Sequence, residues 1–147
     1  MDELTQSVSR ALAAAEAALI ASRYDVWIFS ASNVWTIRWM VLRALNPELA
    51  ARGCETGIAP EHVIGVSTLL ADREGRLHKD HLLVRNEPRY AGMNAEYLSG
   101  LRLTARLNFP APTYSGKVAC ILDLIGEQPY LAAGDSPGDL PMLAWSE

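Results

Sequence analysis

The chain has 147 residues, half of them apolar, with a formal net charge of −4 and a pI near 5.4. This length fits one domain with a hydrophobic core. The acidic balance and the scattered basic residues exclude an extended nucleic-acid or anionic-membrane surface, and no apolar run reaches the roughly 18 residues of a membrane span.

The cysteines and the start of the chain point to a cytoplasmic location. Cys54 and Cys120 lack metal-ligand or redox spacing, so we expect two free thiols in a reducing compartment. Asp2 and Glu3 make the start acidic, whereas a secretory signal begins with positive charge.

Apolar periodicity and turn residues predict alternating helices and strands. In chain order we expect a helix over 2–22, a strand over 25–29, a polar turn at 30–33, a helix over 34–51, a strand over 62–70 that continues as a hairpin over 67–84 with its turn at 72–75, an irregular segment over 86–115, a helix over 115–126, a strand over 130–134 and a final helix from 137. This alternation predicts an α/β layered domain with a mostly parallel sheet.

Two polar stretches follow predicted strands and mark the expected site. Residues 30–33 (SASN) follow the first strand, and residues 134–139 (GDSPGD) follow the last. Ligands of open α/β sheets bind beyond the carboxyl ends of the strands. We therefore expect both stretches at one edge of the sheet.

The second stretch contains two carboxylates. Ser136, Pro137 and Asp139 together are typical of a helix start with a capping box. That interpretation leaves Asp135 unexplained, a charge at the end of a buried strand. Two carboxylates this close repel unless a cation lies beside them, and Mg²⁺ is the usual oxygen-liganded occupant.

Ser30 and Lys117 each allow two interpretations. Ser30 is either a turn or cap residue, with Ser32 and Asn33 as equal alternatives for the cap, or a hydroxyl donor to an anion. Lys117 heads a helix whose dipole disfavours it, so it is either a surface residue or is held by an anion or by carboxylates. The phosphate-binding P-loop is absent, because Ala111 and Val118 break its pattern.

The order of these motifs resembles the haloacid dehalogenase-like hydrolases, especially the phosphoserine and phosphorylcholine phosphatase branch. The matching stretches are VWIFSAS with Ser30, SGKVACIL with Lys117, and AAGDSPGDLPML with Asp135 and Asp139. The resemblance implies a Rossmann-like three-layer core with an added β-hairpin. It also implies Mg²⁺-dependent hydrolysis of a small phosphorylated metabolite.

The resemblance assigns a role to each matched residue. Ser30, with the backbone of Ala31, would bind the phosphoryl oxygens, and Lys117 would neutralise the phosphoryl group. Asp135 would ligate Mg²⁺, while Asp139 would support the water shell of the metal or Lys117. Phosphoryl transfer depends mostly on such positioning and charge neutralisation.

The D-x-D motif that supplies the nucleophile of the family is absent from the 147 residues. The central strand that carries it and the substrate-selecting cap domain are expected to be missing too. We therefore expect residues 1–147 to be one partial core domain, the carboxyl-terminal part of such a phosphatase, inactive alone.

An alternative hypothesis is a catalytically inactive interaction module that pairs with another chain, or with itself, through exposed strand edges. Trp35 and Trp39 are then candidate contacts, although aromatic residues four apart on a helix are also typical of a core. Four aromatic side chains of the irregular segment either hold a quaternary ammonium by cation–π contact or pack ordinarily: Tyr90, Tyr97, Phe109 and Tyr114.

Overall fold

The computed structural model describes residues 20–86, 90 and 94–147. In chain order its elements are β1 (Ile28–Asn33), α2 (Val34–Met40), a π-helical segment (Val41–Leu45), α3 (Asn46–Ala51), a 3₁₀ turn (Pro60–His62), β2 (Val63–Val66), β3 (Thr68–Ala71), β4 (Leu77–His78), α4 (Asp80–Asn86), α5 (Ala95–Ser99), β5 (Arg102–Leu107), α6 (Ser115–Leu124), a 3₁₀ turn (Pro137–Asp139) and α7 (Leu140–Trp145). Within these ranges no helix is both long and apolar enough to span a bilayer.

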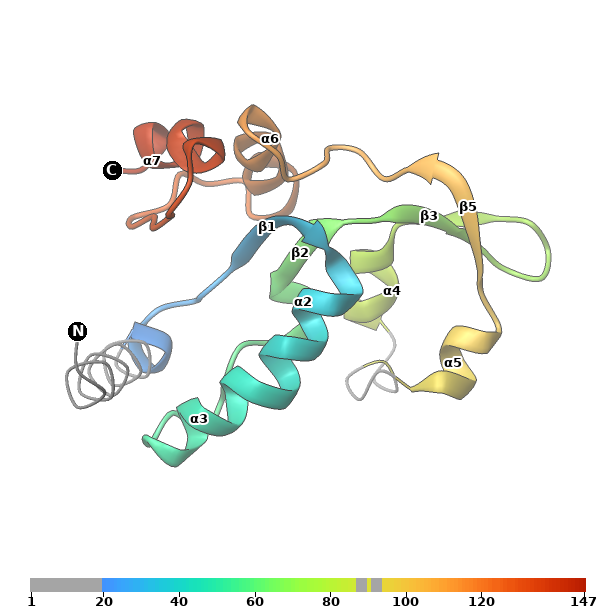
Figure 1. Cartoon of the computed structure of the whole chain (residues 1–147), viewed down its shortest axis with the longest axis horizontal. Helices are drawn as coiled ribbons and strands as arrows, with labels where there is room; N and C mark the ends of the chain where they lie inside the picture. The colour runs from blue at the N-terminus through green and yellow to red at the C-terminus, as the bar shows by residue number, and fades with distance from the viewer. Residues whose placement is uncertain (1–19, 87–89, 91–93) are drawn as a thin grey trace, which may run out of the picture.

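The fold is mixed α/β and contains two small sheets. β1 and β2 run parallel, with Ile28 opposite Val63 and Phe29 opposite Ile64. The second sheet is antiparallel in the order β4-β3-β5. In Figure 1, α2 and α6 lie on opposite sides of β1, and both contact that strand.

The hydrophobic core lies between the parallel sheet and the helical stretch from α2 to α3. Its buried members are Val41, Leu49, Cys54, Ile58 and Val63. Burying one such aliphatic side chain contributes about 1.5–3 kcal/mol. The packing of this core therefore determines where β1 lies. It also determines where the residues after β1 begin.

Gly65 of β2 lets the sheet and α2 approach closely. A Cβ atom there would lie 2.7 Å from the Cα of Val34 and 2.8 Å from the carbonyl oxygen of Ser32. Any larger residue would push β2 away from the start of α2.

Several predicted elements are confirmed. The helix over 34–51 forms with a π-helical segment inside it, and Gly53 after it has a φ of 90°. Pro47 lacks an N–H group, so the regular helical hydrogen-bond pattern is interrupted at this point. The turn at 72–75 forms, because Asp72 Oδ1 accepts hydrogen bonds from the backbone N–H groups of Glu74 and Arg76.

The strand predicted over 62–70 is two strands in different sheets. The chain leaves the parallel sheet at Ser67, whose carbonyl oxygen accepts a hydrogen bond from Asn108 N–H at 2.9 Å. The hairpin prediction is wrong in its second half. Only Leu77 and His78 pair with β3, and the chain then turns into α4, which buries Asp80 and Val84.

The segment predicted to be irregular over 86–115 contains regular structure. Asn94 Oδ1 caps α5 by accepting hydrogen bonds from the N–H groups of Glu96 and Tyr97. β5 pairs with β3 through non-local contacts, with Leu103 opposite Leu70.

Two further predictions need correction. Residues 30–33 are not a turn but the last four residues of β1, and Asn33 caps α2. The strand predicted over 130–134 does not form, and none of the described strands pairs with this segment. The helix predicted over 2–22 falls mostly outside the described residues, of which 20–23 are helical.

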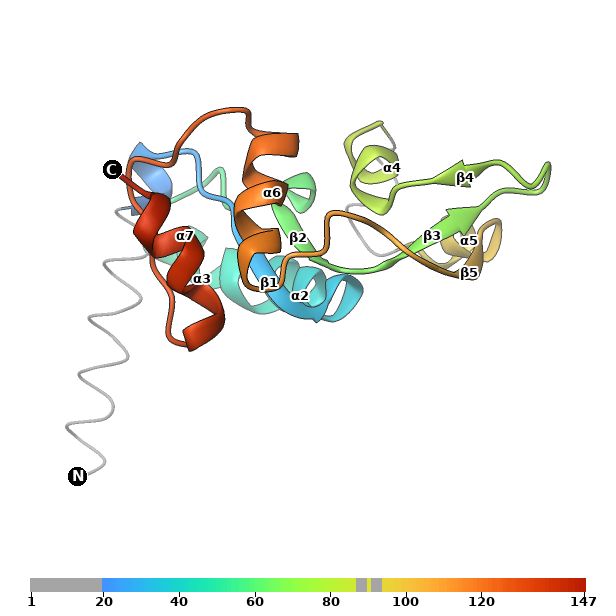
Figure 2. The ribbon, with the colours of Figure 1, turned by 90° about the horizontal axis from the view of Figure 1, so that it is seen from above.

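Figures 1 and 2 show how the remaining elements are arranged. α6 and α7 pack together on one side of the molecule, and the antiparallel sheet projects away on the other side with α4 and α5. This arrangement brings the start of α6 next to the start of α7.

Candidate functional site

Lys117 and Asp139 form a buried ion pair. Lys117 lies in the first turn of α6, and its Nζ donates a hydrogen bond to Oδ1 of Asp139, just before α7. The residues are only 7% and 4% exposed. This contact joins two of the three matched motifs, and it is one of the two roles that the resemblance implied for Asp139.

The second carboxylate oxygen of Asp139 organises the loop before α7. Oδ2 accepts hydrogen bonds from the hydroxyl and N–H groups of Ser136 at 2.7 and 3.0 Å, and from the N–H group of Asp135 at 3.2 Å. The predicted capping box between Ser136 and Asp139 is therefore confirmed.

Gly134 is required by the close packing of this loop. A Cβ atom at Gly134 would lie 2.4 Å from the Cβ of Asp139 and 2.5 Å from its Cγ. The loop can fold over the buried carboxylate only where no side chain intervenes.

These contacts perturb the ionisation of Asp139. The hydrogen bonds from Lys117 and then Ser136 hold the pKa of the Asp139 carboxyl well below its usual range. The ammonium of Lys117 has three donors. Within the described part of the chain, Asp139 is its one acceptor, so the ammonium can still donate to an anion.

The loop before α7 also contains an exposed carboxylate, that of Asp135. Its side chain has no partner among the described residues, whereas both oxygens of Asp139 are occupied. The described residues contain no group of three or more His, Cys, Asp or Glu that could hold a metal. Mg²⁺ is typically bound by one or two carboxylates together with waters and substrate phosphates, so this donor set suits Mg²⁺ only together with a phosphate.

Ser30 and Ala31 lie within β1, on a separate element from the Lys117–Asp139 pair. Ser30 Oγ accepts a hydrogen bond from the N–H group of Ser32 at 3.1 Å, and this contact leaves its hydroxyl proton available. α6 packs against β1, but none of the hydrogen bonds between described residues joins Ser30 or Ala31 to the pair. Asn33, and not Ser30 or Ser32, caps α2.

A second polar cluster was missed by the sequence analysis. Arg38 is fully buried and donates to Asp80 at 2.6 Å and to the hydroxyl of Tyr90 at 2.9 Å. Asp80 also accepts hydrogen bonds from Tyr90 and from the indole of Trp35. Arg38 donates its remaining hydrogen bonds to the carbonyl oxygens of Pro60 and Val63.

The hydrogen-bonding groups of this cluster satisfy one another. The cluster therefore holds its elements together and does not bind a ligand. Tyr90 and Trp35 are occupied within it, and Tyr90 meets Tyr97 edge-to-face at 5.5 Å. Phe109 and Tyr114 are 67% and 65% exposed. Residue spacing gave no signal for this network, because α2 and α4 are adjacent only in the folded chain.

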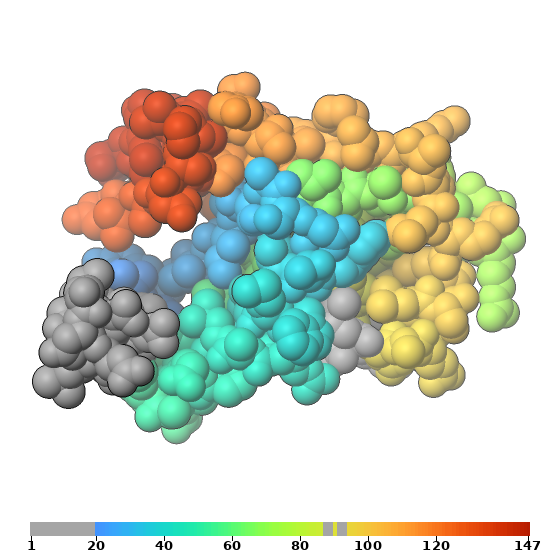
Figure 3. Space-filling model, viewed as in Figure 1, coloured from blue at the N-terminus to red at the C-terminus, as the bar shows by residue number. Residues whose placement is uncertain are grey.

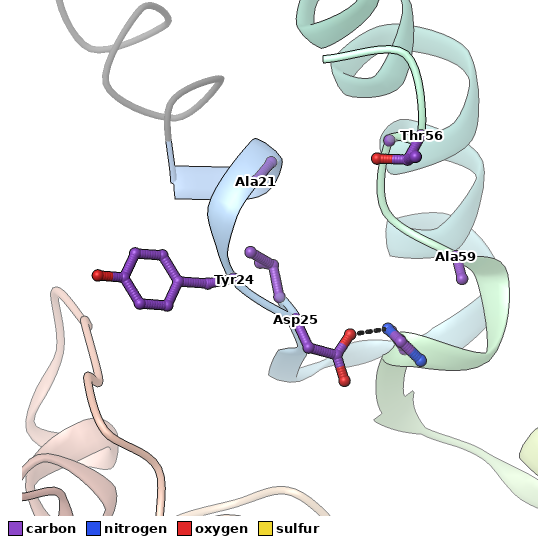
Figure 4. A pocket seen from close by; sticks show the side chains of 8 residues that line it. Ala21, Tyr24, Asp25, Thr56 and Ala59 are labelled. Atoms are coloured by element: carbon purple, nitrogen blue, oxygen red, sulfur yellow. Dashed lines mark ion pairs between the residues drawn. The ribbon is translucent and has the colours of Figure 1, made fainter.

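A hollow of about 240 Å³ lies near the amino end of β1 (Figure 4). Asp25 forms an ion pair with Nδ1 of His62 at 3.1 Å and accepts a hydrogen bond from the Trp27 indole. The dashed line at the labelled Asp25 in Figure 4 marks this ion pair. These polar groups satisfy one another, and Asp25 precedes β1 instead of following it.

No protein-family model matches the sequence, and no curated protein matches it either.

Proposed function

We propose that this chain carries the phosphate-binding half of a phosphomonoester hydrolase site of the haloacid dehalogenase type, built on a Rossmann-like core. The observation that carries the proposal is the buried contact between Lys117 and Asp139. The layering of α2 and α6 on opposite sides of a parallel strand pair also supports it.

The chemistry of the site suits a small phosphorylated metabolite. Lys117 lies in the first turn of α6, where the positive end of the helix dipole also favours an anion. Its ammonium would neutralise the phosphoryl oxygens, and the Ser30 hydroxyl would donate to them. Asp139 holds the ammonium in place. Mg²⁺ held by Asp135 would add charge neutralisation when bound.

The proposed activity of the chain alone is binding without hydrolysis. None of the 147 residues belongs to the D-x-D motif that supplies the nucleophile of the family that the chain resembles. Appreciable Mg²⁺-dependent turnover that survives repurification and is lost in Asp135→Asn would contradict this part of the proposal.

Calorimetric titration of the chain with inorganic phosphate in the presence of MgCl₂ tests the proposal. Lys117→Met should weaken binding about tenfold or more, because a hydrogen bond to a charged group contributes about 1.5–3 kcal/mol. Lys79→Met is the matched control, since Lys79 pairs with Asp123 on the surface at 3.3 Å. Equal binding by the two variants, or no binding by the parent chain, would overturn the proposal.

A second variant pair avoids any effect on folding. Asp135→Asn removes an exposed carboxylate without a partner in the described structure, and Asp123→Asn removes a surface carboxylate elsewhere. The proposal expects only Asp135→Asn to abolish the dependence of phosphate binding on Mg²⁺.

The edge of β1 that faces away from β2 favours a second candidate function. No described strand pairs with this edge, so the chain is also a candidate interaction module that pairs with another chain or a second copy.

A further inference from the structure

The hollow at the amino end of β1 is lined by two segments that are far apart in the sequence (Figure 4). One segment, over 21–26, leads into β1, and the other, over 56–62, leads into β2. In Figure 3 the residues that lead into β1, in blue, lie at the surface of the molecule. The side chain of Asp25 in this hollow is 71% exposed, so small molecules can reach it from the solvent.

The wall over 56–62 is held in place by the side chain of Asn46. This amide accepts a hydrogen bond from the N–H group of Ile58 and donates one to the carbonyl oxygen of the same residue, both at 2.9 Å. Gly57 has a φ of 59°, and a Cβ atom there would lie 2.9 Å from Cγ of Asn46. Ile58 is itself buried in the hydrophobic core. The wall is therefore formed before any ligand arrives, which lowers the cost of binding.

The polar groups of the hollow have unused capacity to accept hydrogen bonds. Asp25 Oδ1 contacts Nδ1 of His62 at 3.1 Å, and Oδ2 accepts a hydrogen bond from the Trp27 indole at 3.0 Å. These contacts orient the carboxylate, but each of its oxygens can accept two hydrogen bonds. The hydroxyl of Thr56, which also lines the hollow, contacts Sγ of Cys54 at 3.9 Å. A donor that enters the hollow would therefore find free acceptors.

The size and charge of the hollow define the class of ligand that fits it. Its volume is about 240 Å³, whereas a cavity of about 150 Å³ is enough for benzene, so a ring with a short polar arm can enter. Ala21, Val26 and Ala59 supply an apolar wall. The described residues of the lining include no Lys or Arg, so the carboxylate of Asp25 attracts a cation.

We propose that this hollow binds a small primary ammonium compound with an apolar body. The ammonium donates hydrogen bonds to the free acceptor positions of Asp25, and the body packs against Ala21, Val26 and Ala59. Because the carboxylate is exposed, its charge adds selectivity for an amine and little affinity.

Titrations of the ¹⁵N-labelled full chain with benzylamine and with benzyl alcohol, at pH 8 and low ionic strength, test this inference. The two molecules share a ring, and only the amine is charged. We expect the largest amide shifts at residues 56–59 and 62 and at the Trp27 indole, with a dissociation constant about threefold lower for benzylamine. Equal affinities, shifts centred outside the hollow, or no saturable shift would overturn the inference.

Three variants separate the charge from the shape of the hollow. Asp25→Asn keeps the shape and should make the two ligands bind equally, whereas the control Asp123→Asn removes an exposed carboxylate of α6 and should keep the preference for benzylamine. Ala59→Leu fills the apolar wall and should weaken both ligands about tenfold. A preference that persists in Asp25→Asn, or unchanged binding in Ala59→Leu, overturns the inference. Lys117 and Asp135 do not line the hollow, so failure of phosphate binding would overturn the proposed function alone.

Discussion

Arg38, Asp80 and Tyr90 neutralise and satisfy one another in the interior of the chain. Arg38 comes from α2, Asp80 from α4, and Tyr90 from the segment that follows, so a single network joins α2, α4 and that segment. Burial raises the pKa of the Tyr90 hydroxyl above its usual value, and the nearby Asp80 carboxylate adds to this shift. Tyr90 therefore remains a neutral donor to Asp80.

Removing the cation of this network should be severely destabilising. Arg38→Met leaves the Asp80 carboxylate buried without its ionic partner, which costs about 3–5 kcal/mol of unfolding free energy. Urea denaturation followed by circular dichroism measures this change. The control Arg73→Met alters an exposed residue and should stay within about 0.5 kcal/mol of the parent. Similar values for the two variants would contradict the role of the network.

Asp139 makes the stability of the chain depend on pH. Its folded pKa lies below the unfolded value of about 3.9, so its contribution is present above that pH and is lost as the pH falls through the folded pKa. Asp72 behaves in the same way, because hydrogen bonds from His78 and Arg76 lower the pKa of its carboxyl.

The free energy of unfolding should therefore fall as the pH is lowered below about 4. Asp139→Asn should flatten this dependence more than Asp72→Asn does, because Asp72 lies in a solvent-exposed turn where charge interactions are screened. Denaturation curves collected from pH 2 to pH 7 measure the slope. An unchanged slope in Asp139→Asn would refute the assignment.

At the scale of elements, the loop before α7 depends on one glycine. Gly134→Ala places a methyl group in the space of the Asp139 side chain, which should cost about 1–3 kcal/mol through overpacking. Gly138→Ala in the same loop meets only Ser136 Oγ at 3.5 Å and should be near neutral. Thermal denaturation of both variants measures the difference, and equal stability would show that the loop does not close on Asp139.

α6 holds one of the two free cysteines on its buried face. Burial raises the pKa of the Cys120 thiol to about 11, and its Sγ lies 3.2 Å from the carbonyl oxygen of Pro110. Cys54 is equally buried in the core. Both thiols should resist Ellman's reagent at pH 8 in the folded chain and react after unfolding in guanidinium chloride. Rapid reaction of either thiol before unfolding would show that its element opens readily.

Local features could be predicted from the sequence better than the pairing of distant strands could. Helices with clear apolar periodicity, the turn at Asp72 and the capping box at Ser136 depend on nearby residues, and all three are present in the structure. The contact between Lys117 and Asp139 was one of the alternatives that the helix dipole and the family resemblance left open. It joins residues 22 positions apart, a separation that periodicity cannot predict.

Pairing between distant strands could not be predicted in the same way. The apolar stretch over 130–134 has the composition of a strand, but a strand forms only where a neighbour accepts its hydrogen bonds. β5 shows the converse, because its pairing with β3 orders a stretch that had been interpreted as irregular. The alternation of Leu103 and Leu107 with polar residues was a signal that could have identified this strand.

At the scale of the whole molecule, two small sheets and their helices belong to one chain, and the proposed site takes residues from α6, from the loop before α7 and from β1. The site joins elements from both ends of the described chain, so its residues meet only if the layers around β1 assemble. A ligand at this site should therefore perturb all three matched motifs together.

The most direct measurement is a titration of the ¹⁵N-labelled chain with inorganic phosphate and MgCl₂, followed by amide chemical shifts. We predict that the largest shifts cluster at residues 30–32, 116–118 and 134–136. Shifts centred on the basic turn at 73–79, or no shifts at the start of α6, would contradict a phosphate site at Lys117.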